Sequence, residues 1–415
     1  MPFLCIDLKS FYASVECALR GLDPFTTNLV VADKERGGGS IVLAATPCIK
    51  AHGAKSRCRI YELPKNVYPI YAKPRMNKYI EYSAMVYKIY LRFVSKEDIH
   101  VYSIDEAFLD LTSYMKYYNC SIFEMAKKII DTIFKETKIT ATAGIGDNMF
   151  LAKVALDIIA KHEKDNIGYL NQELFQEKIW NHKPITDIWG IGNGMAKRLY
   201  HMGIDTIGQI AKGKKERFID LFGIMGEELY NHAYGIDNSS IQEIKDYVPS
   251  STSLGNGQVL FEDYNCHDAY IILEEMIYRL VLDLHVKKLT TNSISLFIGY
   301  SKGYEGSFCK QTKLLYQTSS FKLIMQEFKY LYWENIINNP IRHLSVRAGG
   351  LKPDSYLAFD LFNDSDSLLK ERNLYRAIVE IRERFGKNAI NKAISLDEKA
   401  TLIKRNGLIG GHNAN

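Results

Sequence analysis

The sequence gives no sign of a cysteine framework or of a membrane-spanning segment. Its seven cysteines are odd in number, scattered along the 415 residues, and form no Cys-x-x-Cys pair, so neither a set of disulfides nor a zinc site is indicated. No run of 18 apolar residues occurs, and the first residues lack the basic-then-apolar pattern of a signal peptide. We therefore expect a soluble, cytoplasmic protein with reduced cysteines and no membrane partner.

The sequence also lacks a large excess of charge. With 53 basic and 48 acidic residues, the net charge is +5, which is only a weak indication of a nucleic-acid partner. One segment, residues 33–60, is locally basic, with two acids against these six cations: Lys34, Arg36, Lys50, Lys55, Arg57 and Arg59. This segment could bind a polyphosphate. A hydrophobic content of 47% and a length of 415 residues predict two to four globular domains.

Three carboxylates interrupt apolar segments. Asp105 and Glu106 lie within Val101–Leu111, whose apolar alternation predicts a strand, and Asp7 ends the apolar run that begins at Phe3. A single Asp at a strand end is usually a turn former or a helix cap. Ionised acids that are neighbours and partly buried repel each other unless a positive partner is present. Three of them at the ends of two strands could bind two hard metal ions.

These acids stand in two motifs. Asp7 to Glu16 reads DLKSFYASVE and Ser103 to Ala107 reads SIDEA. Both segments resemble the metal-binding motifs of the Y-family DNA polymerases, the translesion enzymes. The tail of the chain resembles that of their UmuC/ImpB/SamB-like branch. The resemblance implies a multidomain α+β fold, a right-hand polymerase with a ferredoxin-like palm, small fingers, a helical thumb and an α/β little finger.

Hydrophobic patterning and the resemblance together suggest a domain plan. The pattern predicts helices over 149–161 and 368–385 and a strand over 341–349. Strands interleaved with helices, with acids on the central strands, indicate an α+β sheet covered on one face. By resemblance, the parts are a split palm at residues 1–170, fingers inserted at about 20–75, a thumb at 171–237, a linker at 238–248, a little finger at 249–358, and a tail at 359–415.

The resemblance assigns the metal chemistry. Asp7 and Asp105 would bridge two Mg²⁺ ions, for which Mn²⁺ is a usual substitute, and Glu106 would complete the site of the primer 3′-hydroxyl. The carbonyl of Leu8 would complete the site on the nucleotide side. The implied reaction is nucleotidyl transfer from a dNTP to the primer end.

Two aromatic residues follow the first acid. Tyr12 occupies the position of the family's steric gate, where a flat ring leaves no room for a ribose 2′-hydroxyl, and Phe11 would pack beside it. Without the resemblance, a Phe-Tyr pair would be interpreted as part of the core.

The expected triphosphate contacts depart from the family pattern in one place. Lys50 stands where the family usually has Arg, but Pro47 replaces the usual Tyr of the fingers, with the Thr46 hydroxyl as a partial replacement. Lys161 matches the palm lysine that reaches the phosphates. On its own, a lysine at a helix end is explained by the helix dipole.

A glycine-rich turn lies in the thumb segment. Asp187 to Leu199 is typical of a helix-hairpin-helix, in which Gly190 and Gly192 allow a tight turn whose free N–H groups bind a DNA phosphate. Gly194 and Lys197 complete the predicted DNA-binding set. The alternative is an ordinary hairpin of two helices.

The tail contains a candidate clamp-binding peptide. Phe359, Leu361 and Phe362 stand where the branch often has a Gln-Leu-x-Leu-Phe peptide that binds a sliding clamp, although Gln is Ala here and the first Leu is Phe. Alternatively, these side chains cover the edge of the little finger.

The preferred interpretation is a monomeric, template-directed DNA polymerase of low fidelity that acts on primer–template DNA in SOS-type damage tolerance. A nucleotide cyclase also uses paired acids and two metals, but it has no need of a helix-hairpin-helix or a tethered domain. A non-catalytic DNA- or clamp-binding protein is the other alternative. The intact Asp7, Asp105 and Glu106 argue against it.

Overall fold

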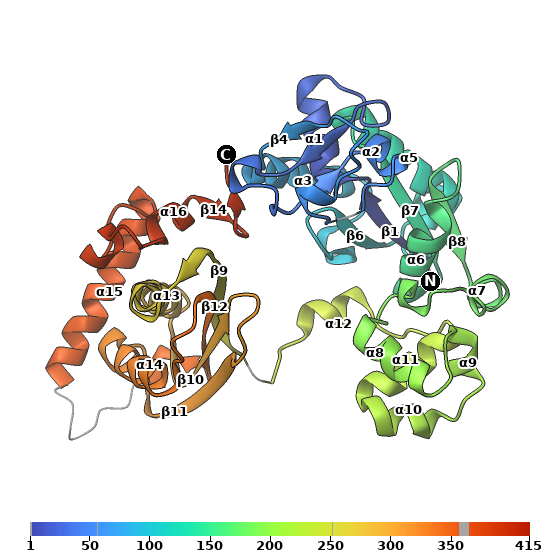
Figure 1. Ribbon diagram of the computed structural model, residues 1–415. Helices are drawn as coiled ribbons and strands as arrows, with labels where there is room; N and C mark the ends of the chain where they lie inside the picture. The colour runs from blue at the N-terminus through green and yellow to red at the C-terminus, as the bar shows by residue number, and fades with distance from the viewer. Residues whose placement is uncertain (1, 56, 251, 357–364) are drawn as a thin grey trace. The chain divides into compact units, whose positions relative to one another are not determined.

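The computed structural model describes residues 2–55, 57–250, 252–356 and 365–415. The chain forms two compact units: the first is Met1–Tyr247 with Ala414–Asn415, and the second is Val248–Asn413 (Figure 1). Among the described residues, no helix has both the length and the apolar character needed to cross a membrane. Each unit has its own sheet and core and is described separately.

The central sheet of the first unit has the strand order β5-β6-β1-β7-β8. All neighbours are antiparallel except β7 and β8, which are parallel. The strands are β1 Phe3–Leu8, β5 Ile99–Val101, β6 Glu106–Asp110, β7 Ala141–Gly146 and β8 Ile167–Leu170. The first acidic motif therefore starts on the central strand of the sheet.

Helices cover this sheet on both faces around β7, whereas the sequence predicted cover on one face. Every residue of β7 is buried, and both α5 (Ile122–Thr137) and α6 (Met149–Val154) pack against it. The expected α-helix over 149–161 changes into a π-helix at Ala155–Ala160. Such short π segments are frequent at functional sites.

Glycine in β7 allows α6 to approach closely. A Cβ atom at Gly144 would lie 2.1 Å from the carbonyl oxygen of Ala152 and 2.3 Å from the backbone nitrogen of Leu156. We expect Gly144→Ala to lower the free energy of unfolding by about 1–3 kcal/mol, because the backbone at Ala152 and Leu156 would have to move. Urea unfolding measures this, with Gly39→Ala as the control, because a Cβ at Gly39 would meet nothing within 4 Å. Equal stability of the two variants would contradict the packing.

A small three-stranded sheet, with the order β3-β2-β4, lies within residues 20–75, the segment predicted to be the fingers. Its strands are β2 Leu29–Val31, β3 Ala44–Ala45 and β4 Ile70–Ala72, and α2 (Pro47–Ala51) follows β3. A separate core contains Val30, Ile49 and Cys58. The remaining helices of this part of the chain are α1 Phe11–Arg20, α3 Met76–Tyr90 and α4 Met115–Tyr118.

The end of the first unit is helical, as the sequence predicts from about residue 171. Its helices are α7 Gln172–Ile179, α8 Asn193–His201, α9 Ile207–Ala211, α10 Lys215–Phe222, α11 Ile224–Ala233 and α12 Ile241–Asp246. The last of these lies inside the expected linker 238–248. It forms because Ser240 and Glu243 make a capping box, and because Ile241 is buried against Phe3 and Met149.

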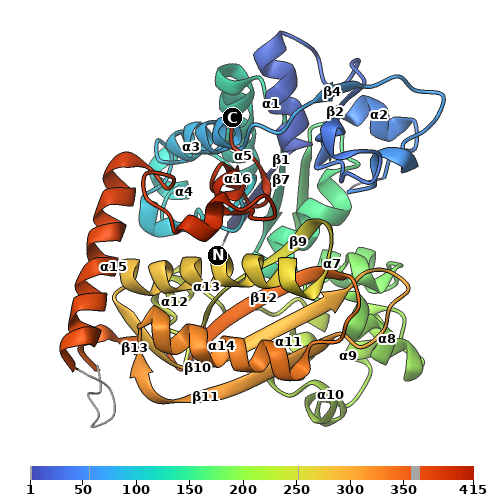
Figure 2. The same ribbon diagram turned by 60° about the vertical axis from the view of Figure 1, so that its left-hand side comes forward.

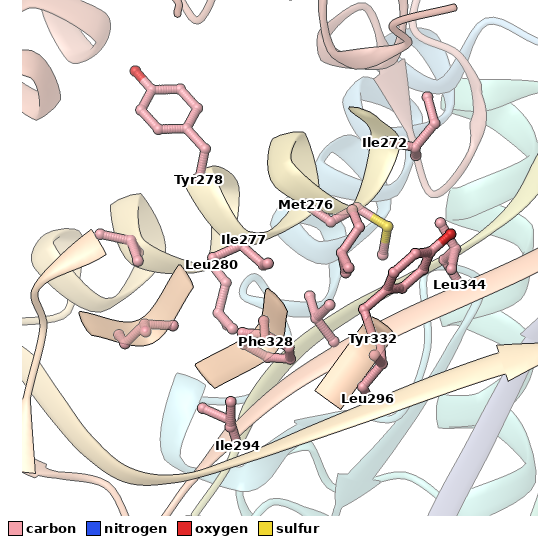
Figure 3. Packing of buried hydrophobic residues seen from close by; sticks show 14 of the residues in the cluster. Ile272, Met276, Ile277, Tyr278, Leu280, Ile294, Leu296, Phe328, Tyr332 and Leu344 are labelled. Atoms are coloured by element: carbon pink, nitrogen blue, oxygen red, sulfur yellow. The ribbon is translucent and has the colours of Figure 1, made fainter. Parts of the chain in front are cut away.

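The second unit has a sheet with the order β11-β10-β12-β9, with β13 (Lys352–Pro353) paired to β10. Its main strands are β9 Leu254–Tyr264, β10 Leu289–Tyr300, β11 Phe308–Thr318 and β12 Ile341–Gly349. Helices α13 (Cys266–Val286) and α14 (Phe321–Asn335) lie along it (Figure 2). Ile277, Leu296, Phe328 and Leu344 meet in the core between helices and sheet (Figure 3).

The described part of the expected tail packs onto this second unit. Its elements are α15 Ser365–Phe385, α16 Leu402–Asn406, β14 Leu408–Ile409 and β15 His412–Asn413. Tyr375, Ile378 and Leu402 join the core of the unit. The buried Glu275 of α13 accepts hydrogen bonds from the backbone N–H groups of Thr401 (2.7 Å) and Leu402 (3.0 Å), which fixes the start of α16.

Candidate active site

The three predicted acids lie together at one end of two central strands. Asp7 of β1 is directly opposite Glu106 of β6 in the antiparallel ladder, so the two side chains share one face of the sheet. The backbone N–H of Leu8 donates to the carbonyl oxygen of Asp105 at 2.9 Å, which places Asp105 beside the same end. The pairing of β1 with β6 thus brings together acids that lie far apart in the sequence.

The prediction of a single strand over 101–111 is wrong. The chain turns between β5 and β6, and the N–H groups of Tyr102 and Ser103 both donate to the carbonyl oxygen of Glu106, each at 3.0 Å. The hydroxyl of Ser103 also donates to the Asp105 carboxylate at 2.6 Å. Short polar side chains that bond to the local backbone favour a turn. Asp105 consequently lies in a turn, and Glu106 begins a strand.

The electrostatics of the acids favour a cation. Burial, followed by the charges of Asp105 and Glu106, raises the pKa of Asp7 to about 7. Carboxylate oxygens are the ligands that Mg²⁺ prefers, and a cation would relieve this repulsion, so the donor set fits a divalent ion. In the described part of the chain, however, no three acidic, His or Cys side chains are already gathered in a coordinating arrangement.

The side chain of Glu106 is instead directed to a buried lysine. Lys153 Nζ lies 2.7 Å from Glu106 Oε1, with both side chains only 10% exposed, and the thiol of Cys5 donates to the same oxygen at 3.2 Å. Lys153 also pairs with Asp157 at 3.0 Å, and Asp157 pairs with Lys161 at 2.9 Å. Sequence reasoning missed Lys153 and Asp157. The sequence feature that could have revealed them is a pair of opposite charges one helical turn apart in the otherwise apolar segment 149–160.

Tyr12 rests on a second tyrosine. Its ring stacks on that of Tyr79 of α3, with centroids 4.4 Å apart and planes at 17°, while Phe11 is buried next to it. The Tyr79 hydroxyl donates to the fully buried Glu16 at 2.9 Å, and Arg75 donates to both oxygens of Glu16, at 3.0 and 2.6 Å. Glu16 therefore fixes the ring that supports Tyr12. Neither Tyr79 nor the role of Glu16 was predicted.

Removing the charge of Glu16 should weaken the fold in a pH-dependent way. Burial alone would raise the pKa of Glu16, but hydrogen bonds from Arg75, Arg20 and Tyr79 hold it below its ordinary value. The stabilisation is thus present above the unfolded pKa and is lost as the pH falls through the lower folded value. We expect Glu16→Gln to cost about 1–3 kcal/mol at pH 7. Denaturant unfolding of both proteins from pH 7 down to about pH 3, below the ordinary pKa of a glutamate, should show this difference shrinking, and a constant difference would contradict it.

The two lysines that were predicted to bind phosphate come from different elements: Lys50 lies in α2, and Lys161 follows the π-helix Ala155–Ala160. Lys50 Nζ donates to the hydroxyl of Ser10 at 2.9 Å. Burial lowers the pKa of Lys50; the negative charge of Asp7 opposes this shift, and the positive charge of Lys161 adds to it. The charges of Asp7 and Lys161 therefore both act on the Lys50 ammonium. Ser10 has a left-handed backbone, with φ of 51°.

Thr46 does not have the surroundings expected of a phosphate ligand. Its side chain is fully buried, its hydroxyl donates to the carbonyl oxygen of Thr27 at 2.7 Å, and it accepts from the N–H of Leu29 at 3.2 Å. The hydroxyl ties α2 to the start of β2. The expectation that Thr46 replaces the missing tyrosine is corrected accordingly.

The glycine turn of the predicted thumb segment is exposed. Gly190 has a φ of 91°, Gly192 precedes the first residue of α8, and a Cβ at either position or at Gly194 would meet nothing within 4 Å. Lys197 is exposed on α8. The segment before the turn is a short 3₁₀ helix, Ile185–Asp187, rather than an α-helix. The candidate clamp peptide, Phe359, Leu361 and Phe362, lies outside the described residues.

Comparison with known proteins identifies the family. A model of the impB/mucB/samB family matches residues 6–157, and a model of the C-terminal domain of that family matches residues 251–361. The "Putative UV-damage repair protein UvrX" of Bacillus subtilis is 35% identical over 99% of this chain and 97% of its own length. The chain belongs to the impB/mucB/samB family.

Other relatives agree with this assignment. A protein named DNA polymerase IV 2 from Bacillus subtilis is 31% identical over 98% of this chain and 97% of its own length. Among solved structures, a Y-family DNA polymerase chimera, Dbh-Dpo4(243-245)-Dbh, matches with a TM-score of 0.66 and 22% identity, over 85% of this chain and 100% of that one. The family and the polymerase fold predicted from the two acidic motifs are confirmed.

Proposed function

We propose that this protein is a template-directed DNA polymerase that copies past lesions with low fidelity, joining a dNTP to a primer 3′-hydroxyl. The observation that supports it most strongly is the position of Asp7 opposite Glu106, with Asp105 beside them and Lys50 and Lys161 near the same acids. The names of the relatives, DNA polymerase IV and a UV-damage repair protein, point the same way.

The carboxylates would hold the ions. Asp7 and Asp105 would bind both divalent cations, which we propose to be Mg²⁺ with Mn²⁺ as a substitute, with Glu106 on the primer side and the Leu8 carbonyl on the nucleotide side. When bound, the ions would lower the pKa of the primer hydroxyl and neutralise the leaving pyrophosphate. The protein itself contributes orientation and charge.

Side chains around the acids would select and hold the nucleotide. The Tyr12 ring, which stacks on Tyr79, would exclude a ribose 2′-hydroxyl. Phe11 would pack beside Tyr12 and anchor this part of α1 in the core. Lys50 and Lys161 would contact the triphosphate. Thr46 is not included, because its hydroxyl is already used inside the fingers.

Two surfaces would hold DNA. The open turn at Gly190, Gly192 and Gly194 offers backbone N–H groups to a phosphate, with Lys197 adding a cation. In the second unit, Ile294 and Leu296 face the helices, so the alternate positions, among them Lys313 and Arg347, lie on the other face of the sheet. We propose that this face contacts the duplex backbone, and that the protein acts as a cytoplasmic monomer with an optional sliding clamp.

Single-nucleotide insertion tests the proposal. A primer annealed to four templates that differ only in the templating base is incubated with Mg²⁺ and each dNTP in turn. We expect each template to favour its complementary dNTP, with frequent errors. A protein that binds primer–template but inserts no nucleotide with either Mg²⁺ or Mn²⁺ would instead support the non-catalytic accessory interpretation.

A further inference from the structure

The buried lysine next to the acids has no part in the function proposed above. Lys153 projects from α6 onto the face of the sheet where Asp7, Cys5 and Glu106 lie, because residues opposite each other in the ladder share that face and Gly144 lets α6 approach it. At 2.7 Å from Glu106 and 10% exposed, its ammonium is a cation already bound to a proposed metal ligand.

Glu106 Oε1 is fully engaged by this arrangement. It accepts from Lys153 on one side and from the Cys5 thiol on the other. A divalent ion that uses this oxygen must displace the lysine, and one that uses the second oxygen must approach a fixed positive charge. Either way, the lysine opposes the ion through its charge while it fixes the orientation of the carboxylate.

Lys153 is itself held in place by Asp157. This carboxylate stands four residues after Lys153 and four residues before Lys161, and it pairs with Lys153 through Oδ2 (3.0 Å) and with Lys161 through Oδ1 (2.9 Å). Asp157 lies in the π-helix Ala155–Ala160. The local charges therefore form a chain, in which Glu106, Lys153, Asp157 and Lys161 alternate in sign.

We infer that Lys153 is a positioning residue that serves as a built-in counter-ion of Glu106 and sets the affinity of the acidic site for divalent cations. The inference rests on the proposed function, since it takes Glu106 as a metal ligand. With Lys153 in place, the free enzyme should bind divalent ions weakly. Removing the lysine charge should strengthen metal binding while it disturbs the orientation of Glu106.

Mn²⁺ binding to the full-length protein, without DNA or nucleotide, tests this inference. Electron paramagnetic resonance of free Mn²⁺ gives the dissociation constant for wild type, Lys153→Met and Asp157→Asn. We expect Lys153→Met to bind Mn²⁺ about tenfold more tightly, since one repelling charge is removed from a partly buried site. Asp157→Asn should bind Mn²⁺ more weakly than the wild type. Without the Asp157 carboxylate, the ion pair with Glu106 is the one that Lys153 retains among the contacts of the described residues, so the lysine should compete more strongly with the ion for Glu106.

A double-mutant cycle distinguishes competition between Lys153 and Mn²⁺ for Glu106 from a general change in the electrostatic potential of the site. In a Glu106→Gln background, the effect of Lys153→Met on Mn²⁺ affinity should shrink to less than about threefold, because the competition for Glu106 no longer exists. The same gain with and without Glu106 would overturn the inference. So would an unchanged Mn²⁺ affinity in Lys153→Met, provided that circular dichroism shows a folded protein.

The remaining outcomes are also decisive. If Lys153→Met does not fold, Asp157→Asn decides the matter: weaker Mn²⁺ binding supports the inference, and unchanged or tighter binding overturns it. Nucleotide insertion by the wild type is measured in parallel. An active wild type with unaltered Mn²⁺ affinity in the variants refutes only the role of Lys153, whereas an inactive wild type refutes the proposed polymerase.

Discussion

Asp105→Asn and Glu106→Gln should each lower the rate of nucleotide insertion by on the order of 10³-fold, with little change in the affinity for primer–template DNA. Each substitution keeps the shape of the side chain and removes one negative charge from the proposed ion site, and loss of a single preorganised electrostatic group commonly costs 10²- to 10³-fold. Single-turnover insertion with excess enzyme measures the effect without a contribution from product release.

Asp110→Asn is the matched control for this pair. Asp110 ends the same strand, β6, and its carboxylate accepts from the N–H of Thr112 at 2.9 Å, far along the strand from Glu106. We expect it to keep near-normal activity. If Asp105→Asn and Glu106→Gln were as active as Asp110→Asn, these acids would not be metal ligands in the reaction.

Tyr12→Ala should raise ribonucleotide insertion relative to deoxyribonucleotide insertion by roughly 10- to 100-fold. The ring is fixed by stacking on Tyr79 at 4.4 Å, so a 2′-hydroxyl would have to overpack against a surface that cannot easily move, which costs about 1–3 kcal/mol. The ratio of kcat/KM for rCTP and dCTP opposite template G measures this selectivity.

Tyr12→Phe provides the control for the gate. It keeps the ring and the stacking while it removes the hydroxyl, so the discrimination against ribonucleotides should stay close to that of the wild type. A Tyr12→Ala variant with unchanged discrimination would show that another group excludes the 2′-hydroxyl.

The acidic site could be predicted because its signals are local. Asp7 and Glu106 each interrupt an apolar segment, and strand pairing is enough to bring them together. The contact of Glu106 with Lys153 could not be predicted in the same way. It depends on how closely α6 approaches the sheet, which is set by Gly144 on a different strand, and no spacing along the chain encodes that distance.

Errors elsewhere have a similar physical origin. Thr46 was chosen for its hydroxyl, but burial decides whether a hydroxyl meets a ligand or the backbone, and here it bonds to Thr27. The linker residues were judged by their polarity, although the capping box at Ser240 and one buried apolar residue, Ile241, suffice for a short helix. In contrast, the strand expected at 341–349 is found as Ile341–Gly349, because its alternation faces a well-defined core.

The tail shows that hydrophobic periodicity predicts a helix but not the element against which it packs. A helix over 368–385 was predicted, and α15 spans Ser365–Phe385. Its amphipathic pattern indicated an apolar stripe but not the partner of that stripe, which is α13 of the second unit. Secondary structure can be inferred from one segment, whereas its packing partner depends on the whole fold.

Primer extension on an abasic template is the most direct test of the central claim. Wild-type protein, Mg²⁺ and dNTPs are supplied with a primer that ends one nucleotide before the lesion, beside an undamaged template of the same sequence. We predict extension on both templates, with insertion opposite the abasic site and continued synthesis beyond it. Full extension on the undamaged template with a complete stop at the lesion would contradict a translesion role, and no extension on either would contradict a polymerase.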